Sequence, residues 1–286
     1  MGIDIGRIGV WTSAGERTGS SLNEETVGSF AAEVEKLGYG ALWIGGSQQL
    51  PLTLLRNALA ATERLVVGTG IFRVWDADAA ELAPVWRGLD TDFPGRFLLG
   101  LGVGHAPHVT EYVRPYQKMT SYLDELDEVG VPRRTRVLAA LGPKMIKLAG
   151  DRGAGIHPYL TTPAHTKGAR EILGAGPLVV PEQKVVVEPD LAKARQIARP
   201  TVRFYLDLPN YVNNFRREGF TDADFADGGS DRLIDALIGL GTAEQAFQRV
   251  RGHLDAGADQ VAVQVLGTDL AGMTGPLAQL AEQFAN

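Results

Sequence analysis

Cysteine is absent from this 286-residue chain, which excludes disulfides, thiolate nucleophiles and cysteine-bound metals and fits a reducing compartment. No apolar run approaches the ~20 residues that span a bilayer, and the first residues lack the pattern of a signal peptide. The net charge is only -6, without a lysine or arginine run to cover phosphates. We therefore expect a cytoplasmic protein with no membrane and no nucleic-acid partner.

Several catalytic signatures are also missing. The sequence has no GxSxG motif, no HxH pair after its first predicted strand and no histidine–carboxylate cluster with zinc or iron spacing. These absences argue against a serine hydrolase and a metal hydrolase. We expect no metal site.

Short apolar, β-branched runs recur along the chain with helical patterns between them, which is typical of parallel strands joined by helices. Such runs predict eight strands, at 7–11, 41–44, 65–71, 97–101, 136–141, 156–160, 179–188 and 260–266. The pattern predicts an α/β fold, a (β/α)8 TIM barrel that forms one domain over residues 1–286. Residues 189–230 have helical patches and no convincing strand, so we interpret them as an insertion between strands seven and eight.

Three glycines, Gly100, Gly102 and Gly104, follow the fourth predicted strand. The third glycine of a dinucleotide-binding GxGxxG would fall at His105, and no helix begins there. Two other interpretations stay open: these glycines let the backbone turn out of a crowded barrel mouth, or they let a flat ligand lie against it.

Two helix starts carry proline at their first position. Gly142-Pro143-Lys144 follows the fifth strand, and Thr162-Pro163 follows the sixth. Free N–H groups at such starts attract anions, so two neighbouring ones predict a phosphate cradle; the alternative is two well-formed helix ends and no more.

The histidines divide by position. His105 and His108 follow strand four at the functional end, His157 lies near the start of strand six in a structural position, and His253 is expected as a cation in the last turn of a helix. With Trp11 and Trp75, the predicted mouth is apolar and aromatic and has few acid–base groups. Such a mouth suits an organic cofactor that carries the chemistry itself.

The segments RIGVW, LGYGALWIG, RLVVGTGIFRVW, RFLLGLGVGH, AALGPKMIKLAGDRGAGIHPYL and HLDAGADQVAVQVL together resemble the luciferase-like monooxygenase superfamily, in particular its deazaflavin-dependent oxidoreductase branch. The resemblance covers nearly the whole chain in the right order. It implies a TIM barrel that binds reduced flavin mononucleotide (FMN) or the deazaflavin coenzyme F-420 at its C-terminal mouth.

The resemblance also implies positions for the cofactor. A cis peptide bond is expected at Gly70-Ile71, with the ring over Thr69, Gly70 and Ile71 and with Gly104, His105 and His108 along one side. The phosphate is expected on Leu141, Gly142, Pro143 and Lys144 and near Thr162. Many deazaflavin-dependent relatives carry a basic histidine just after strand two. Here that segment reads Ile44-Gly45-Gly46-Ser47, and His105 or His108 could exchange protons instead. The alternative is that these two histidines only orient the cofactor or cap the loop.

The resulting hypothesis is an oxidoreductase that transfers hydride between coenzyme F-420 and a small organic substrate. A second hypothesis is an FMN-dependent monooxygenase that uses oxygen and reduced flavin from a separate flavin or deazaflavin reductase. The third is a non-catalytic barrel that binds cofactor without turnover. By analogy with relatives we also expect a homodimer.

Overall fold

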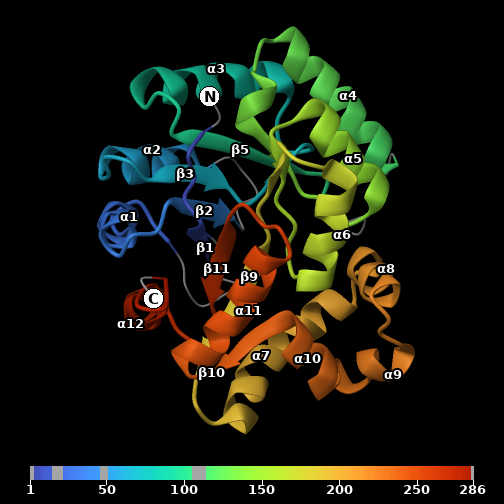
Figure 1. The fold of residues 1–286 in the computed structure, drawn as a ribbon. Helices are drawn as coiled ribbons and strands as arrows, with labels where there is room; N and C mark the ends of the chain where they lie inside the picture. Colours follow the sequence, from blue (N-terminus) through green and yellow to red (C-terminus); the bar gives the residue numbers. More distant parts are fainter. Residues whose placement is uncertain (1–2, 15–21, 46–50, 105–113, 285–286) are drawn as a thin grey trace.

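The computed structural model describes residues 3–14, 22–45, 51–104 and 114–284 (Figure 1). Its strands are β1 (Ile8–Ser13), β2 (Ala41–Gly45), β3 (Val66–Thr69), β4 (Phe72–Arg73), β5 (Phe97–Gly102), β6 (Arg136–Leu138), β7 (Gly155–Ile156), β8 (Leu178–Val179), β9 (Glu182–Val187), β10 (Ile238–Gly241) and β11 (Val261–Val265). Its α-helices are α1 (Val27–Lys36), α2 (Leu52–Ala60), α3 (Ala79–Asp92), α4 (Pro115–Glu128), α5 (Pro143–Arg152), α6 (Pro163–Leu173), α7 (Leu191–Leu206), α8 (Pro209–Arg217), α9 (Asp222–Phe225), α10 (Asp231–Leu237), α11 (Ala243–Asp255) and α12 (Leu270–Ala281). Two 3-10 turns, η3 (Arg133–Thr135) and η4 (Ala226–Gly228), complete the described elements.

The strands form one curled, parallel sheet in the order β10-β9-β11-β1-β2-β3-β5-β6-β7-β8, with β4 paired to β5. Only Val180 and Pro181 separate β8 from β9, so the two strands are one run of chain. The N–H of Val180 donates to Ile156 on one side, at 3.0 Å, and the N–H of Ala262 donates to Pro181 on the other, at 2.9 Å. The run β8–β9 therefore joins the two ends of the sheet.

Each of the eight predicted strands has a counterpart among the described elements. Strands five and six are shorter than predicted, since β6 ends at Leu138 and β7 at Ile156. The short strand β10, which pairs with the C-terminal part of β9 from Lys184 to Val187, was not predicted. Residues 189–230 contain α7, α8, α9 and η4 and no strand, as their pattern indicated. Their status as an insertion in a barrel stays a prediction.

The helices lie outside the sheet and cover it with apolar faces. Figure 1 shows α1 to α6 around one side and α7 to α10 grouped at the opposite end of the view. The main core lies between sheet and helices, and a smaller cluster that includes Trp11, Trp43 and Val180 fills the inside of the curl. Parallel strands that are covered on both faces are continuously apolar, which explains runs such as Val66–Thr69 and Phe97–Gly102. Among the described residues no helix is long and apolar enough to cross a membrane.

Close approach of β3 and β5 requires glycine. The hydroxyl of Thr69 accepts a hydrogen bond from the N–H of Gly100 and donates to the carbonyl oxygen of the same residue, both at 2.8 Å. A Cβ at position 100 would overlap the carbonyl oxygen of Thr69. Because backbone atoms occupy that space, no side-chain rotation could relieve the overlap.

We therefore expect Gly100→Ala to lower the free energy of unfolding by about 3 kcal/mol, at the upper end of overpacking effects. The matched control is Gly168→Ala in α6, where a Cβ meets nothing within 4 Å and alanine should stabilise the helix by up to ~1 kcal/mol. Urea denaturation of both variants measures the difference. Equal stabilities would contradict the close approach of β3 and β5.

Candidate functional site

The candidate site lies at the mouth of the curled sheet, the end at which the parallel strands finish. Because side chains alternate along a strand, one set from each strand points inside the curl. The register pairs Trp11 of β1 with Trp43 of β2, and Gln264 of β11 with Lys184 of β9. Aromatic and polar side chains thus meet at the carboxyl ends of the strands.

One wall of the mouth is apolar and is built around the indole of Trp11. Its Nε1–H donates to the carbonyl oxygen of Gly70 at 3.1 Å. A Cβ at Gly45 or Gly70 would overlap this indole, and a Cβ at Gly102 would come within 2.5 Å of the Ile71 side chain. These glycines therefore make room for two side chains, which supports the interpretation that glycines relieve crowding at the mouth.

The Gly70-Ile71 peptide bond is cis, as the resemblance implied. Of the three residues expected beneath a cofactor ring, Thr69 is 1% exposed, Gly70 is buried and Ile71 is partly exposed. The Thr69 hydroxyl is already bonded to Gly100. Ile71 is therefore the residue of this group that offers surface to a ligand.

Gly104 has a positive φ of 64°, a backbone conformation that favours glycine. A Cβ there would come 3.1 Å from the Arg73 side chain, which is held by an ion pair to Asp76 at 2.7 Å. His105 and His108, our candidates for proton exchange, lie outside the described residues. Their role stays a prediction.

The other histidines are buried. The ring of His157 stacks on Trp43 with centroids 4.3 Å apart, and its Nδ1–H donates to the carbonyl oxygen of Val180 at 2.7 Å. Burial lowers the pKa of His157 to about 4, so the ring is neutral near pH 7. Its Nε2 has no hydrogen-bond partner. The structural role expected for His157 fits these contacts.

His253 is not the helix-end cation that we expected. It is fully buried between α6 and β9, where Nδ1 accepts from the Thr166 hydroxyl at 2.7 Å and Nε2–H donates to Gln183 Oε1 at 2.9 Å. Burial lowers the pKa of His253 to about 3. The position in the last turn of α11 is correct, but desolvation outweighs the helix dipole.

The two helix starts of the predicted cradle lie next to each other. Gly142 is the N-cap of α5 and has no side-chain cap, and a Cβ on it would meet nothing within 4 Å. The His165 Nε2–H, in the first turn of α6, donates to the carbonyl oxygen of Leu141 at 3.0 Å. Lys144 is exposed, one residue after Pro143. The start of α5 thus presents open backbone and an adjacent cation.

Thr162 is the N-cap of α6, as the sequence indicated, and its hydroxyl oxygen accepts from the N–H of His165 at 3.3 Å. The same hydroxyl donates to the carboxylate of Glu218, which also accepts from Asn214 at 2.6 Å. Burial raises the pKa of Glu218. A carboxylate thus already lies at the start of α6, so α5 offers the more open half of the cradle.

Glu182 and Lys184 in β9 were not among the predicted site residues. Their side chains are both 0% exposed, and Lys184 Nζ lies 2.9 Å from Glu182 Oε2. Nζ also lies 3.5 Å from the ring centroid of Tyr159. Residues two apart on a strand share a face, so the signal was present in PEQKVVV: two opposite charges on one face of an otherwise apolar strand.

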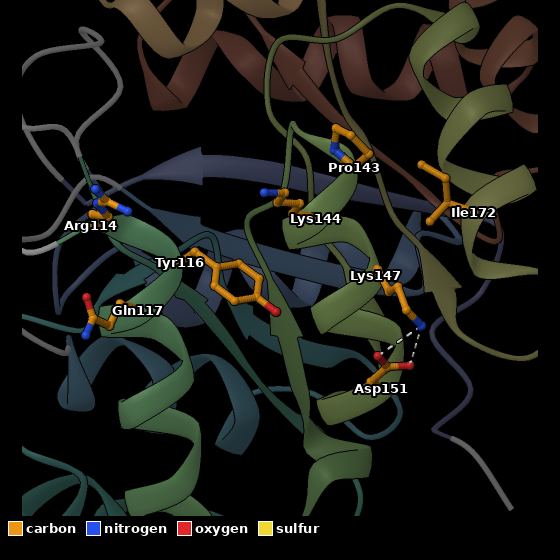
Figure 2. A pocket seen from close by; sticks show the side chains of 8 residues that line it. All are labelled: Arg114, Tyr116, Gln117, Pro143, Lys144, Lys147, Asp151 and Ile172. Atoms are coloured by element: carbon orange, nitrogen blue, oxygen red, sulfur yellow. Dashed lines mark hydrogen bonds and ion pairs between the residues drawn. The ribbon is translucent and has the colours of Figure 1, made fainter.

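A groove runs outside the sheet between α4 and α5 (Figure 2). It has a volume of about 830 Å³ and is lined by Arg114, Tyr116, Gln117, Pro143, Lys144, Lys147, Asp151 and Ile172. Lys147 is paired with Asp151 at 3.2 Å, whereas Lys144 lies at the end of the groove where α5 begins. The groove therefore continues from the open half of the cradle.

Residues 6–130 match the model of the luciferase-like monooxygenase family. The match confirms the resemblance to this family that was seen in the sequence. It also confirms the expectation that the protein is an enzyme. Among curated proteins no sequence matches the chain.

Solved structures of the same fold include both cofactor classes. An F-420-dependent secondary alcohol dehydrogenase in complex with an F-420–acetone adduct aligns with a TM-score of 0.73 and 15% identity, over 96% of this chain and 97% of that chain. The F-420-dependent tetrahydromethanopterin reductase from Methanopyrus kandleri gives a TM-score of 0.74, 15% identity and the same coverage. The FMN complex of the oxygenating constituent of 3,6-diketocamphane monooxygenase from Pseudomonas putida gives 0.68, 15% identity and 96% of both chains. At this identity the likeness shows the fold alone.

The neutral histidines predict how stability depends on pH. Between pH 6.5 and 4 the unfolded chain takes up a proton at position 157 that the folded protein excludes, so stability falls as pH falls through this window. At about 1.4 kcal/mol per pKa unit, His157 contributes about 3 kcal/mol to this loss. His157→Phe should keep the stack on Trp43 and remove that share, at a cost of about 1 kcal/mol near pH 7.5 for the lost hydrogen bond. Urea denaturation at pH 7.5 and 4.5 measures both the stability cost of the substitution and the loss of stability at low pH. An unchanged pH dependence in the variant would contradict a neutral, buried His157.

Proposed function

We propose that this protein is an oxidoreductase that transfers hydride between coenzyme F-420 and a small organic substrate. The family match and the two F-420-dependent neighbours support the class of enzyme. The observation that carries the proposal is the uncapped start of α5, which opens into a groove whose charged residues are Arg114, Lys144 and the ion pair Lys147–Asp151. This arrangement suits a cofactor that carries negative charges on the part of the molecule far from its ring.

The described residues fit such a cofactor. Ile71, backed by the buried indole of Trp11, would bear one face of the ring. The backbone N–H group of Lys144 in the first turn of α5 would bind the phosphate, with the Lys144 ammonium nearby. Gly142 would let the phosphate approach the backbone, because no side chain fills that space. When bound, the deazaflavin ring supplies the hydride acceptor or donor; the protein orients it and excludes water.

The groove favours F-420 over FMN. FMN ends at its phosphate, whereas F-420 continues past its phosphate into a tail that carries glutamate carboxylates. A tail that leaves the start of α5 between α4 and α5 would pass Arg114, Lys144 and Lys147. These cations give no comparable advantage to FMN.

Proton exchange is proposed for His105 or His108 on position alone. The homodimer and a separate reductase also stay proposals. The FMN-dependent neighbour keeps a second candidate open, a luciferase-like monooxygenase fed with reduced flavin. Oxygen consumption separates the two, because a deazaflavin does not activate oxygen as a flavin does.

The testing experiment is a fluorescence titration of the purified protein with F-420 and, in parallel, with FMN. Micromolar binding of F-420 with a weak response to FMN would support the proposal. The reverse preference would favour the monooxygenase. Failure to bind either cofactor would reject both.

Gly142→Asp should weaken F-420 binding at least tenfold, because its carboxylate would lie where the cofactor phosphate is proposed. The fold should persist, since position 142 is open and aspartate is a favourable N-cap. Gly142→Asn is the matched control: it has the same size and capping ability without the charge, so its affinity should fall less. Equal affinities of the aspartate, asparagine and parent proteins would reject the cradle.

The double substitution Lys144→Glu/Lys147→Glu should weaken F-420 binding more than FMN binding. Each reversed charge at an exposed site is worth up to about 1 kcal/mol, so we expect roughly a tenfold or larger loss for F-420, reduced at high salt. Lys36→Glu/Lys193→Glu, at two exposed sites away from the groove, changes the net charge by the same amount and is the matched control. Equal losses for the two cofactors would contradict a tail in this groove.

A further inference from the structure

The pair Glu182–Lys184 is costly for the fold. Among the ion pairs of the described residues, this is the one in which both side chains are wholly inaccessible to solvent. Removing two charges from water costs several kcal/mol per ion, and well-packed apolar side chains of similar volume often stabilise a fold better. Packing alone therefore does not explain why these two charged side chains are buried.

Its hydrogen bonding is incomplete. Glu182 Oε2 accepts from Lys184 Nζ and from the N–H of Leu160, at 2.9 and 3.1 Å, while Glu182 Oε1 has no hydrogen-bond partner among the residues that the structure describes. The ammonium has three donors, of which one serves Glu182 and another points at the face of Tyr159. A buried polar pair with unused capacity suits a polar ligand.

The pair lies at the mouth, one aromatic ring away from the apolar wall. Tyr159 covers Lys184 Nζ, its hydroxyl donates to Gln264 Oε1 at 2.9 Å, and its ring centroid is 5.2 Å from that of Trp11. Trp11 in turn bonds to Gly70. Tyr159 is partly exposed, so it is the side chain that separates the ammonium from a ligand in the mouth.

The surroundings of Lys184 contain one charged group. Glu182 faces it from its own strand, and the remaining titratable side chains around the pair are Tyr159, Tyr205 of α7 and Tyr211 of α8. Burial lowers the pKa of Lys184 to about 8 and raises the pKa of Glu182. An amine in this range can exchange a proton near neutral pH.

We infer that Lys184, held by Glu182, takes the place of His105 or His108 and exchanges the hydroxyl proton of an alcohol substrate at the mouth once the ring of Tyr159 moves aside. This inference rests on the proposed function. As the alcohol is oxidised, its carbinol carbon loses a hydride to the oxidised deazaflavin, its O–H proton passes to the neutral amine of Lys184, and the C–O bond becomes C=O. Reduction of the ketone or aldehyde runs in reverse, with the ammonium returning the proton.

The first test needs no cofactor. The folded protein is treated with formaldehyde and cyanoborohydride from pH 6.5 to 10, and methylation of each lysine is followed by mass spectrometry. Lys184 should react with a midpoint near pH 8, and Tyr159→Ala should speed its reaction; the exposed Lys193 shows that the reagent is active. Protection of Lys184 at every pH, with Lys193 modified, would overturn the inference.

The second test uses F-420 with a panel of primary and secondary alcohols and the matching carbonyl compounds. Lys184→Arg keeps a cation for Glu182 but cannot deprotonate, so it should bind F-420 within twofold of the parent and turn over at least 100-fold more slowly. Lys193→Arg should match the parent. Glu182→Gln/Lys184→Met, which removes both charges, checks that turnover and not folding is lost.

The outcomes separate the inference from the function on which it rests. Absence of F-420 binding by the parent protein would reject the proposed function, and methylation would still decide whether a small reactant reaches Lys184. F-420 binding without turnover of any alcohol or carbonyl compound would overturn the inference and leave the cofactor proposal standing. Full turnover by Lys184→Arg would also overturn it.

Discussion

The hydrogen bond from the Trp11 indole to the carbonyl oxygen of Gly70 requires residues without side chains around the indole, and this requirement shapes the mouth of the sheet. Trp11 can reach Gly70 only because Gly45 and Gly70 carry no side chain. Neighbouring strands β3 and β5 approach closely for the same reason, through Thr69 and the bare backbone at Gly100. The wall around Trp11 is therefore apolar because Gly45 and Gly70 leave room for the indole, and the buried charge pair lies on β9, two strands away from β1 in the sheet.

The helix starts around the mouth differ in what they offer an anion. At α6 the Thr162 hydroxyl and the Glu218 carboxylate already pair, so negative charge arriving there would meet negative charge. At α5 the cap is glycine, the first residue is proline and the groove beyond it carries cations. The proposed cofactor phosphate would accordingly lie closer to α5, and the partly buried Glu218 would limit how closely it approaches Thr162.

The order of strands and helices could be predicted because each element carries its own periodicity and its own ends. Thr162-Pro163 indicated the start of a helix, and Thr162 caps α6 in the structure. The environment of His253 could not be predicted, because it depends on Thr166 and Gln183, which are 87 and 70 residues away in sequence. Only part of the phosphate cradle could be predicted. The sequence indicated the two helix starts, but Glu218 at the end of α8 contacts Thr162, and no local sequence pattern indicates such a contact.

The pair Glu182–Lys184 shows that the two faces of a buried strand need to be considered separately when its sequence is interpreted. In β9 the alternation sends Gln183 outward to His253 and sends Glu182 and Lys184 inward, so one strand supplies both a packing contact and a buried charge pair. If stability alone shaped this strand, apolar side chains at both inward positions would serve better. Tyr159 lies between these charges and Trp11, with its ring centroid 5.2 Å from that of Trp11 and 3.5 Å from Lys184 Nζ. The alternation that builds the sheet thus brings a buried charge pair within one aromatic ring of the apolar wall, beside the place where the proposed cofactor and substrate would lie.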